Sequence, residues 1–369
     1  MRAVAAVPGE REVRLVDHPE PQLLSPTHVA IRVREVGVCG TDREIAAGKH
    51  GEAPEGSPYL VLGHEALGEV VEVGTSVTRL RRGELVVPTV RRPCRERRCR
   101  ACGMGRPDFC ETDEFTQRGI RRAHGFLAER VVDEQRYMIP VPAELRDVAV
   151  LVQPLSVAEA AVRQVEVLQR RLPWAEDPDG SSSRPPARVA VVIGGGPVGA
   201  LAALALRVRG YDTFLHSHEP RGRKSALIES FGVRWSSGRE EAIEALARRA
   251  GPIDVMIEAA GASPVAFEAL AALGPNGVFV FTGIPGRRGP VPREVGNVMP
   301  GIVLRNQAVL GVTNPSADAY RAAVADLALF ARRWPTALPE LVTSRRPVAD
   351  ASDVLSGGAR GLKEVLTFE

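Results

Sequence analysis

Four of the five cysteines lie within the seventeen residues from 94 to 110, spaced as C-x4-C-x2-C-x7-C. Zinc binds four thiolates tetrahedrally at about 2.3 Å, and a site closed by four cysteines is structural. The spacing therefore predicts a structural zinc, with two disulfides or four unrelated thiols as alternatives. The predicted ligands are Cys94, Cys99, Cys102 and Cys110. Basic neighbours, expected to lower the thiol pKa values, are Arg92, Arg95, Arg97, Arg98 and Arg100.

The composition is that of a soluble globular protein. The chain has 369 residues, 44% of them apolar and 25% charged. Since single cores stop growing near ~250–300 residues, we expect two domains. The net charge of +3 is too small to indicate a nucleic-acid partner, and no apolar run approaches the ~20 residues of a membrane span. The N-terminal residues lack the apolar core of a signal peptide, so we expect a cytoplasmic protein, in which disulfides are rare.

The sequence pattern changes along the chain. Residues 1–155 contain short runs rich in valine and isoleucine, closed by glycine, proline or charge, which predicts a small β-barrel. Residues 147–172 predict a helix, and residues 174–188, rich in proline and serine, predict a linker or surface loop. From residue 188 strands alternate with helices of about ten residues, which predicts parallel βαβ units in a doubly wound sheet. The expected fold class is α/β, with a β-barrel domain and a doubly wound domain.

Residues 194–199 read GGGPVG and satisfy the pattern G-x-G-x-x-G. The motif follows an apolar strand and opens a helix, which is the context of a dinucleotide site. Its first glycine permits a tight turn, the second lets the pyrophosphate approach, and the third allows close helix–strand packing. A glycine-rich turn without a ligand is the alternative. The predicted cofactor-binding residues are Gly194, Gly195, Gly196, Pro197, Val198 and Gly199.

The choice between NAD and NADP is decided about 20 residues further on, at the end of the next strand. NAD enzymes usually carry an acidic residue there, but here Glu219 lies one position beyond the expected place. The hydroxyl, imidazole and guanidinium groups nearby suit a 2′-phosphate. We therefore favour NADP, with use of NAD left open and a solvated polar loop as the alternative. These candidate groups are Ser217, His218, Arg221 and Arg223.

A second candidate metal site combines residues that are distant in the sequence. Cys39 lies in GVCGTD, His64 and Glu65 lie in LVLGHEALGE, and Gln153 opens QPLSVAE. A catalytic zinc needs about three protein ligands and one free position, which a thiol, an imidazole and an acid could supply. Taken alone, Cys39 is more often a buried apolar thiol and His64 a core histidine.

The motifs GVCGTDREI, LVLGHEALGEV, GRPDFCET, QPL and GGGPVG occur in the order of zinc-dependent medium-chain dehydrogenases. More narrowly, the chain resembles the glucose 1-dehydrogenase branch known from archaea. The resemblance implies a GroES-like catalytic domain, residues 1–187 and 315–369, and a Rossmann domain, residues 188–314, with the active site between them. It also implies a homodimer or homotetramer.

The resemblance assigns roles to the second metal site. Cys39 and His64 become permanent ligands of a catalytic zinc, and Glu65 joins the metal directly or through water. Gln153 faces both the zinc and the substrate. Asp42 occupies the position that fixes the tautomer of a ligating histidine.

The implied reaction is the oxidation of a sugar or polyol hydroxyl, which would turn an aldose into a lactone. Zinc is redox-silent and acts as a Lewis acid, and the hydride passes to the nicotinamide of NAD(P). Thr41 matches the hydroxyl that hydrogen-bonds the reacting alcohol. Thr282 and Asn314 are further predicted cofactor-binding residues.

The chain departs from the glucose branch in the substrate pocket. Val90, Gln117 and Leu304 stand where relatives carry Asn, Glu and His, whereas Asn314 matches a sugar-contacting asparagine. The cysteine lobe also has two extra residues between its first two cysteines. Because unpaired polar groups penalise binding, a cyclitol, an amino sugar or a simple secondary alcohol is an alternative substrate. The predicted substrate contacts are Thr41, Gln117, Gln153 and Asn314.

Two interpretations from other functional classes compete with that of an enzyme. The chain could be a zinc-stabilised nucleotide-binding protein without catalysis, which would hold one zinc instead of two. A nucleic-acid-binding zinc ribbon is disfavoured, because a ribbon does not need a βαβ nucleotide domain.

Overall fold

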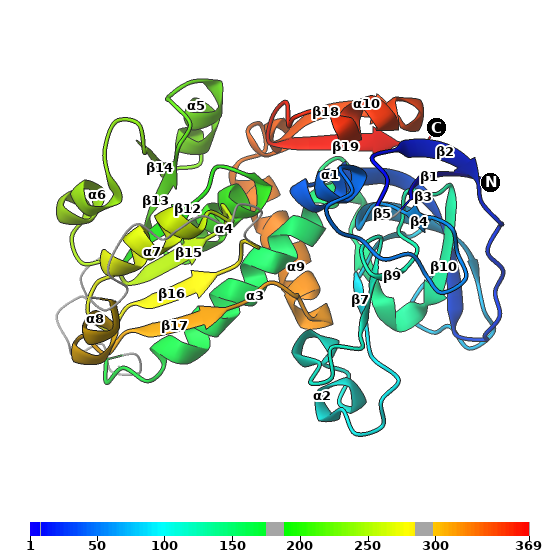
Figure 1. The fold of residues 1–369 in the computed structure, drawn as a ribbon, viewed down its shortest axis with the longest axis horizontal. Coiled ribbons are helices and arrows are strands. Elements are labelled where there is room, and N and C mark those ends of the chain that lie inside the picture. The colour runs from blue at the N-terminus through cyan, green and yellow to red at the C-terminus, as the bar shows by residue number, and fades with distance from the viewer. Residues whose placement is uncertain (8, 175–187, 285–297, 369) are drawn as a thin grey trace. The chain divides into compact units, whose positions relative to one another are not determined.

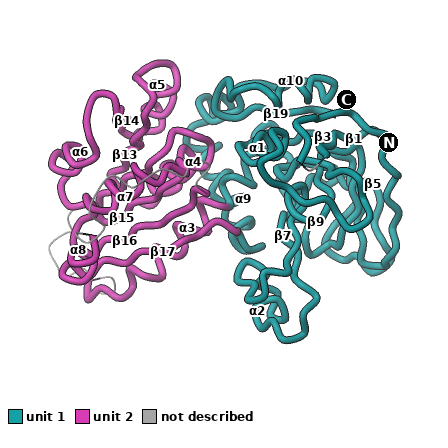
Figure 2. The backbone as a smooth tube through the Cα atoms, viewed as in Figure 1, with its two compact units in different colours: residues 1–156, 315–369 teal, residues 157–314 magenta. Residues whose placement is uncertain are grey.

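The computed structural model describes residues 1–7, 9–174, 188–284 and 298–368. The linker predicted at 174–188 lies almost entirely outside the described residues. The chain forms two compact units, residues 1–156 with 315–369 and residues 157–314 (Figure 2). Among the described helices, none combines the length and the apolar character needed to cross a membrane.

The first unit contains a seven-stranded sheet around one long strand. Its strands are β3 (His28–Val38), β5 (Glu65–Val73), β6 (Leu85–Pro88), β10 (Arg130–Glu134), β11 (Met138–Val141), β18 (Val342–Pro347) and β19 (Lys363–Thr367). The order is β11-β6-β5-β3-β19-β18, and β10 also pairs with β3. β3 pairs antiparallel with both β5 and β19. The C-terminal strand therefore lies within the N-terminal sheet (Figure 1).

Further elements complete this unit. They are β1 (Arg2–Ala6), β2 (Val13–Asp17), β4 (Leu60–Val61), α1 (Gly40–Ala46), α9 (Ala317–Arg333), α10 (Ala351–Ser356), η2 (Gln135–Tyr137), η3 (Ala143–Leu145), η4 (Ala149–Leu151), η6 (Leu338–Leu341) and η7 (Val348–Asp350). β2, β1 and β4 form a separate three-stranded sheet. The valines and isoleucines that predicted a barrel, such as Ile31 and Val36, are fully buried and pack with Phe126 and Leu366 in one core.

The cysteine-rich segment forms a lobe of the first unit (Figure 1). It consists of β7 (Arg91–Arg92), α2 (Arg100–Gly103), η1 (Pro107–Phe109), β8 (Thr116–Arg118) and β9 (Arg122–Ala123). β7, β8 and β9 pair in that order. The guanidinium of Arg91 stacks on the Phe115 ring at 3.4 Å, so side-chain stacking packs this small sheet together.

The second unit is a six-stranded sheet with helices between its strands. The strands are β12 (Val189–Ile193), β13 (Asp212–Ser217), β14 (Arg234–Ser237), β15 (Val255–Glu258), β16 (Val278–Phe281) and β17 (Ala308–Gly311). The helices are α3 (Val152–Gln169), α4 (Pro197–Val208), α5 (Arg223–Ser230), α6 (Ile243–Ala250), α7 (Ser263–Ala271) and α8 (Val298–Leu304). All neighbouring strands pair in parallel, in the order β14-β13-β12-β15-β16-β17. Counted from β12, this is the order 3-2-1-4-5-6 of a doubly wound dinucleotide-binding sheet.

The two units divide within α3, after Ser156, whereas the sequence places the boundary after residue 187. The reason lies in the contacts of the helix. Glu159 accepts a hydrogen bond from Arg209 at 2.8 Å, and the Gln169 side chain donates to the Asp254 carbonyl at 3.4 Å. Most of α3 is therefore anchored to the second unit. The structure and the sequence-based expectation agree that the chain re-enters the first unit at residue 315.

Two elements of the second unit are absent from the sequence-based prediction. β14 has only four residues, RWSS, which are too few to show an alternating pattern. α8 has the sequence VMPGIVL, in which proline and glycine hide the helical period. Both elements form because the neighbouring parallel strands and helices hold them in place.

Candidate functional site

Cys39 lies between the end of β3 and the start of α1, where it is the N-cap residue. Its Sγ accepts the Thr41 amide at 3.2 Å, and its own amide donates to Asp42 Oδ2 at 3.0 Å. These reciprocal bonds form a capping box, in which a thiol occupies the place that a hydroxyl usually takes. The helix start therefore fixes the position of the thiol.

His64 faces Cys39 from the start of β5. Its Nε2 lies 3.2 Å from Cys39 Sγ, and its Nδ1 lies 3.2 Å from Asp42 Oδ1. The chain turns into this position at Gly63, which has φ +82°, a conformation that glycine adopts without strain. The carboxylate behind Nδ1 leaves Nε2 facing the thiol, which is the arrangement that orients metal-binding histidines.

The pKa values of Asp42 and His64 shift in opposite directions. Burial raises the pKa of Asp42, but the charge and hydrogen bond of His64 and bonds from Cys39 outweigh it, so this pKa is lowered. Burial lowers the pKa of His64, but the negative charges of Cys39 and Asp42 hold it well above its ordinary value. Both shifts show that this buried site attracts positive charge.

Glu65 completes the cluster. One ligand atom from each of Cys39, His64 and Glu65 lies within 4.8 Å of the others. Zn–S and Zn–N bonds of ordinary length predict a tetrahedral Sγ–Nε2 separation of about 3.6 Å, close to the 3.2 Å observed. The thiol and the imidazole fit a zinc ion, and the Glu65 carboxylate lies near enough to approach it.

Lys363 contacts the cluster, and Gln153 follows a short helix that packs on the strands leading to it. Gln153 is buried and follows η4, which packs against β3 and β5. Lys363, which the sequence analysis did not single out, donates from Nζ to Glu65 Oε2. The only sequence signal was that lysine is rare, since just three of the 48 basic residues are lysine.

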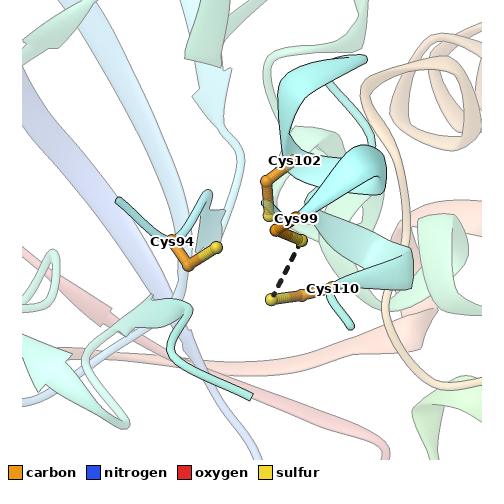
Figure 3. A group of neighbouring side chains, drawn as sticks. All are labelled: Cys94, Cys99, Cys102 and Cys110. Carbon is orange, nitrogen blue, oxygen red and sulfur yellow. Dashed lines mark hydrogen bonds between the residues drawn. The ribbon is translucent and has the colours of Figure 1, made fainter. Parts of the chain in front are cut away.

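The four cysteines of the lobe converge, as Figure 3 shows. Their Sγ atoms all lie within 4.8 Å of one another, and Cys99 and Cys110 are 3.9 Å apart. Zn–S bonds of 2.3 Å predict a tetrahedral S–S separation of about 3.8 Å, whereas a disulfide requires about 2.05 Å. All five cysteines are free thiols. The geometry fits a closed zinc site.

The Cys110 thiol pKa is lowered, but the cause is not the nearby arginines that the sequence suggested. Burial raises the pKa of Cys110, but hydrogen bonds from Thr112 and from neighbouring thiols outweigh it and lower the pKa to about 6. Three of the five expected arginines pair with acids: Arg92 with Asp133 at 2.7 Å, Arg100 with Glu111 at 2.7 Å and Arg98 with Glu96 at 3.8 Å.

The glycine motif joins β12 to α4. Gly194 has φ +113°, and a Cβ there would stand 2.9 Å from the Ala260 amide. A Cβ on Gly199 would collide with the Gly194 carbonyl, so both positions require glycine. Gly196, the N-cap of α4, has open space where its Cβ would be. This loop and the free amides of the helix start fit a pyrophosphate.

The predicted cofactor-selecting residues lie at and beyond the end of β13. Ser217 is buried, and a Cβ on Gly195 would stand 2.8 Å from its Oγ, so the hydroxyl adjoins the glycine loop. His218 is exposed, and its carbonyl accepts a bond from Arg239 at 3.1 Å. Arg221 is engaged with Glu229 at 2.7 Å. Arg239, two residues beyond the end of the unpredicted strand β14, is a further cation near this loop.

The remaining predicted site residues lie elsewhere. The Thr282 hydroxyl donates to the Glu258 carbonyl at 2.7 Å, at the ends of β16 and β15. Gln117 lies in β8 of the cysteine lobe, and Asn314 is the last residue of the second unit. Leu304, in α8, is 81% exposed, whereas Val90 is buried.

Comparisons with known proteins agree with this architecture. Residues 25–143 match the alcohol dehydrogenase GroES-like domain, and residues 146–368 match the glucose dehydrogenase C-terminus. The chain is 36% identical to a glucose 1-dehydrogenase of Methanocella arvoryzae over 98% of each chain. It is 39% identical to one of Thermoproteus tenax, over 89% of this chain and 88% of that one. The structure matches Haloferax mediterranei glucose dehydrogenase in complex with NADP, Zn and gluconolactone with a TM-score of 0.87 and 28% identity, covering 100% of this chain and 99% of that one.

A GroES-like domain followed by a doubly wound domain is the architecture of a medium-chain dehydrogenase. The chain belongs to the zinc-dependent medium-chain dehydrogenases, and within them to the glucose dehydrogenase branch. The predicted resemblance and fold class are thereby confirmed.

Proposed function

We propose that this protein is a zinc-dependent oxidoreductase that transfers a hydride from a sugar or polyol hydroxyl to NAD(P). The observation that carries the proposal is the Cys39–His64 pair, with Sγ and Nε2 3.2 Å apart and Asp42 behind the imidazole. The glucose 1-dehydrogenase relatives support the sugar as substrate class.

The residues of the first unit have separate tasks in this proposal. Cys39 and His64 hold the metal, and Asp42 keeps the proton of His64 on Nδ1, so that Nε2 presents its lone pair. Thr41 Oγ1 accepts a hydrogen bond from the substrate hydroxyl and, as it takes that proton, passes its own toward solvent, and the Gln153 side chain orients the substrate hydroxyl. When bound, zinc supplies a Lewis acid and the nicotinamide accepts the hydride.

The second unit binds the cofactor. The glycine loop from Gly194 to Gly199 and the first turn of α4 hold the pyrophosphate. Ser217 and His218, with the arginines beyond β13, favour a 2′-phosphate, so we propose NADP as the preferred cofactor. The Haloferax glucose dehydrogenase complex with NADP supports this preference.

The particular substrate is a finer proposal. Gln117 is neutral where relatives carry an acid, so it lacks the negative charge that a glucose hydroxyl meets there. We propose an aldose as the first candidate, with a cyclitol, an amino sugar or a secondary alcohol as alternatives. We also propose a homodimer or homotetramer, which light scattering of the purified protein tests.

The deciding experiment measures zinc content together with reduction of NAD and NADP on a panel of aldoses, cyclitols and alcohols. The proposal expects two zinc ions per chain and NADPH formation with at least one aldose or polyol. One zinc per chain and no hydride transfer with any substrate would instead indicate a nucleotide-binding protein without catalysis.

A further inference from the structure

Lys363 is buried inside the first unit with its ammonium group against the candidate metal cluster. Its side chain is 1% exposed. Nζ donates to Glu65 Oε2 and to the Val38 carbonyl, the latter at 3.3 Å. Val38 immediately precedes Cys39, so Lys363 contacts the chain on both sides of the cluster. A lysine this deeply buried is unusual unless its charge is paired.

The surrounding strands leave room for this pair. Gly37 of β3 pairs with Glu65 of β5 on one side and with Val365 of β19 on the other. A Cβ on Gly37 would collide with Glu65 Oε2 and stand 3.2 Å from Lys363 Cδ. The gap holds a compact ammonium group, whereas the chain uses arginine at nearly all its other basic positions.

The neighbouring charges leave Glu65 as the partner of Lys363. Glu364, the next residue in β19, is already paired with Arg43 at 2.5 Å. Asp42 lies against His64. Lys363 is therefore the cation that balances the Glu65 carboxylate, and its grip on Oε2 competes with any metal for that oxygen.

We propose that Lys363 is a positioning residue that keeps Glu65 beside the zinc but out of its ligand set, which leaves a coordination position open for substrate. This inference rests on the catalytic zinc of the proposed function. Without Lys363, Glu65 gains a free oxygen and the site loses a positive charge. Both changes strengthen metal binding, whereas the loss of a residue needed only for folding would weaken it.

Cobalt(II) at the catalytic site provides a readout that does not depend on turnover. Its visible absorption is strong with four ligands and weakens when a further ligand binds. The variants are Lys363→Met, Glu65→Gln and the double variant that combines these two changes. The matched control is Lys224→Met, which removes a lysine from an exposed ion pair with Glu219. Cys39→Ser, which keeps the four-cysteine lobe, supplies the baseline spectrum.

The expected results differ in direction between the variants. In Lys363→Met the visible bands weaken, the zinc dissociation constant falls about tenfold, and kcat falls about ten- to hundredfold. In the double variant the bands return to those of the wild type, because the intruding carboxylate is gone. Glu65→Gln alone leaves the bands unchanged, as does Lys224→Met.

Three outcomes would overturn the proposal. Weaker zinc binding in Lys363→Met is one, and altered bands that persist in the double variant are another. The third is a changed spectrum in Glu65→Gln alone, which would mean that Glu65 is already a ligand, and this test decides even if Lys363→Met does not fold. Failure of the proposed function is distinguishable, because the wild type would then bind one cobalt ion per chain instead of two.

Discussion

The Asp42 carboxylate lies behind the His64 imidazole, with Oδ1 3.2 Å from Nδ1, while its other oxygen accepts the Cys39 amide at 3.0 Å. One side chain thus orients both predicted zinc ligands. Asp42→Asn keeps the shape of the side chain but replaces one carboxylate oxygen, an acceptor, with an amide NH2 group. That donor then faces another donor, either the Nδ1–H of His64 or the Cys39 amide. We expect zinc affinity or activity to fall about ten- to hundredfold, measured by metal titration and kinetics. Asp318→Asn, an exposed aspartate in α9, is the control, and an equal loss there would refute the role of Asp42.

Gly37 of β3 lies between β5, which carries Glu65, and β19, which carries Lys363. Gly37→Ala places a Cβ against the Glu65 carboxylate, so we expect a loss of about 1–3 kcal/mol in the free energy of unfolding. Urea denaturation measures this loss. At Gly358 a Cβ would meet no atom within 4 Å, so Gly358→Ala should change stability by less than about 0.5 kcal/mol. If Gly37→Ala and Gly358→Ala changed the free energy of unfolding equally, the close packing of Glu65 against Gly37 would be refuted.

The two candidate zinc sites should separate stability from turnover. Cys99→Ala removes a ligand from the four-cysteine lobe, and we expect about 4 kcal/mol or more of lost stability together with one zinc per chain. Cys39→Ala should also leave one zinc per chain but abolish turnover with the fold retained. Metal analysis, denaturation and kinetics on both variants check the pair. Full activity in Cys39→Ala would contradict the proposed mechanism.

His124 should make the protein less stable in mild acid. Its Nδ1 accepts the Val61 amide at 3.1 Å, and burial, with repulsion from His18 and Arg118, lowers its pKa to about 4. Between pH 6.5, the ordinary histidine pKa, and pH 4 the unfolded chain binds a proton that the folded chain does not, so stability falls as pH falls.

The pH dependence is measured by urea denaturation between pH 4 and pH 7. His124→Asn keeps an acceptor for the Val61 amide but does not titrate, so we expect a shallower loss of stability across this range. His50→Asn, at an exposed histidine, is the matched control. Equal slopes in the wild type and His124→Asn would rule out His124 as the source.

His218 should influence the choice of cofactor. It is exposed just beyond β13, where an acidic side chain would bond the ribose hydroxyls of NAD and repel a 2′-phosphate. For His218→Asp we expect the ratio of kcat/KM for NADP to that for NAD to fall about tenfold or more. His50→Asp is the control for added negative charge. An unchanged ratio would show that this loop does not select the cofactor.

Much of the fold could be predicted because its signals are local. Alternating strands and helices after residue 188 predicted the doubly wound sheet, and its strand order agrees. Short elements such as β14 and α8 carry too few residues for a period to be visible. The sequence also could not show that most of α3 packs on the second unit, because that depends on partners such as Arg209 and Asp254.

The sequence by itself determined the features in which neighbouring residues act together. The four lobe cysteines span seventeen residues and the glycine motif six, so spacing alone reveals their chemistry. Only the tertiary structure brought Lys363 to Glu65, 298 residues away. That pairing arises because the C-terminal strand β19 lies beside β3 in the N-terminal sheet. A strand's partners depend on the packing of the whole unit, and no short stretch of sequence records them.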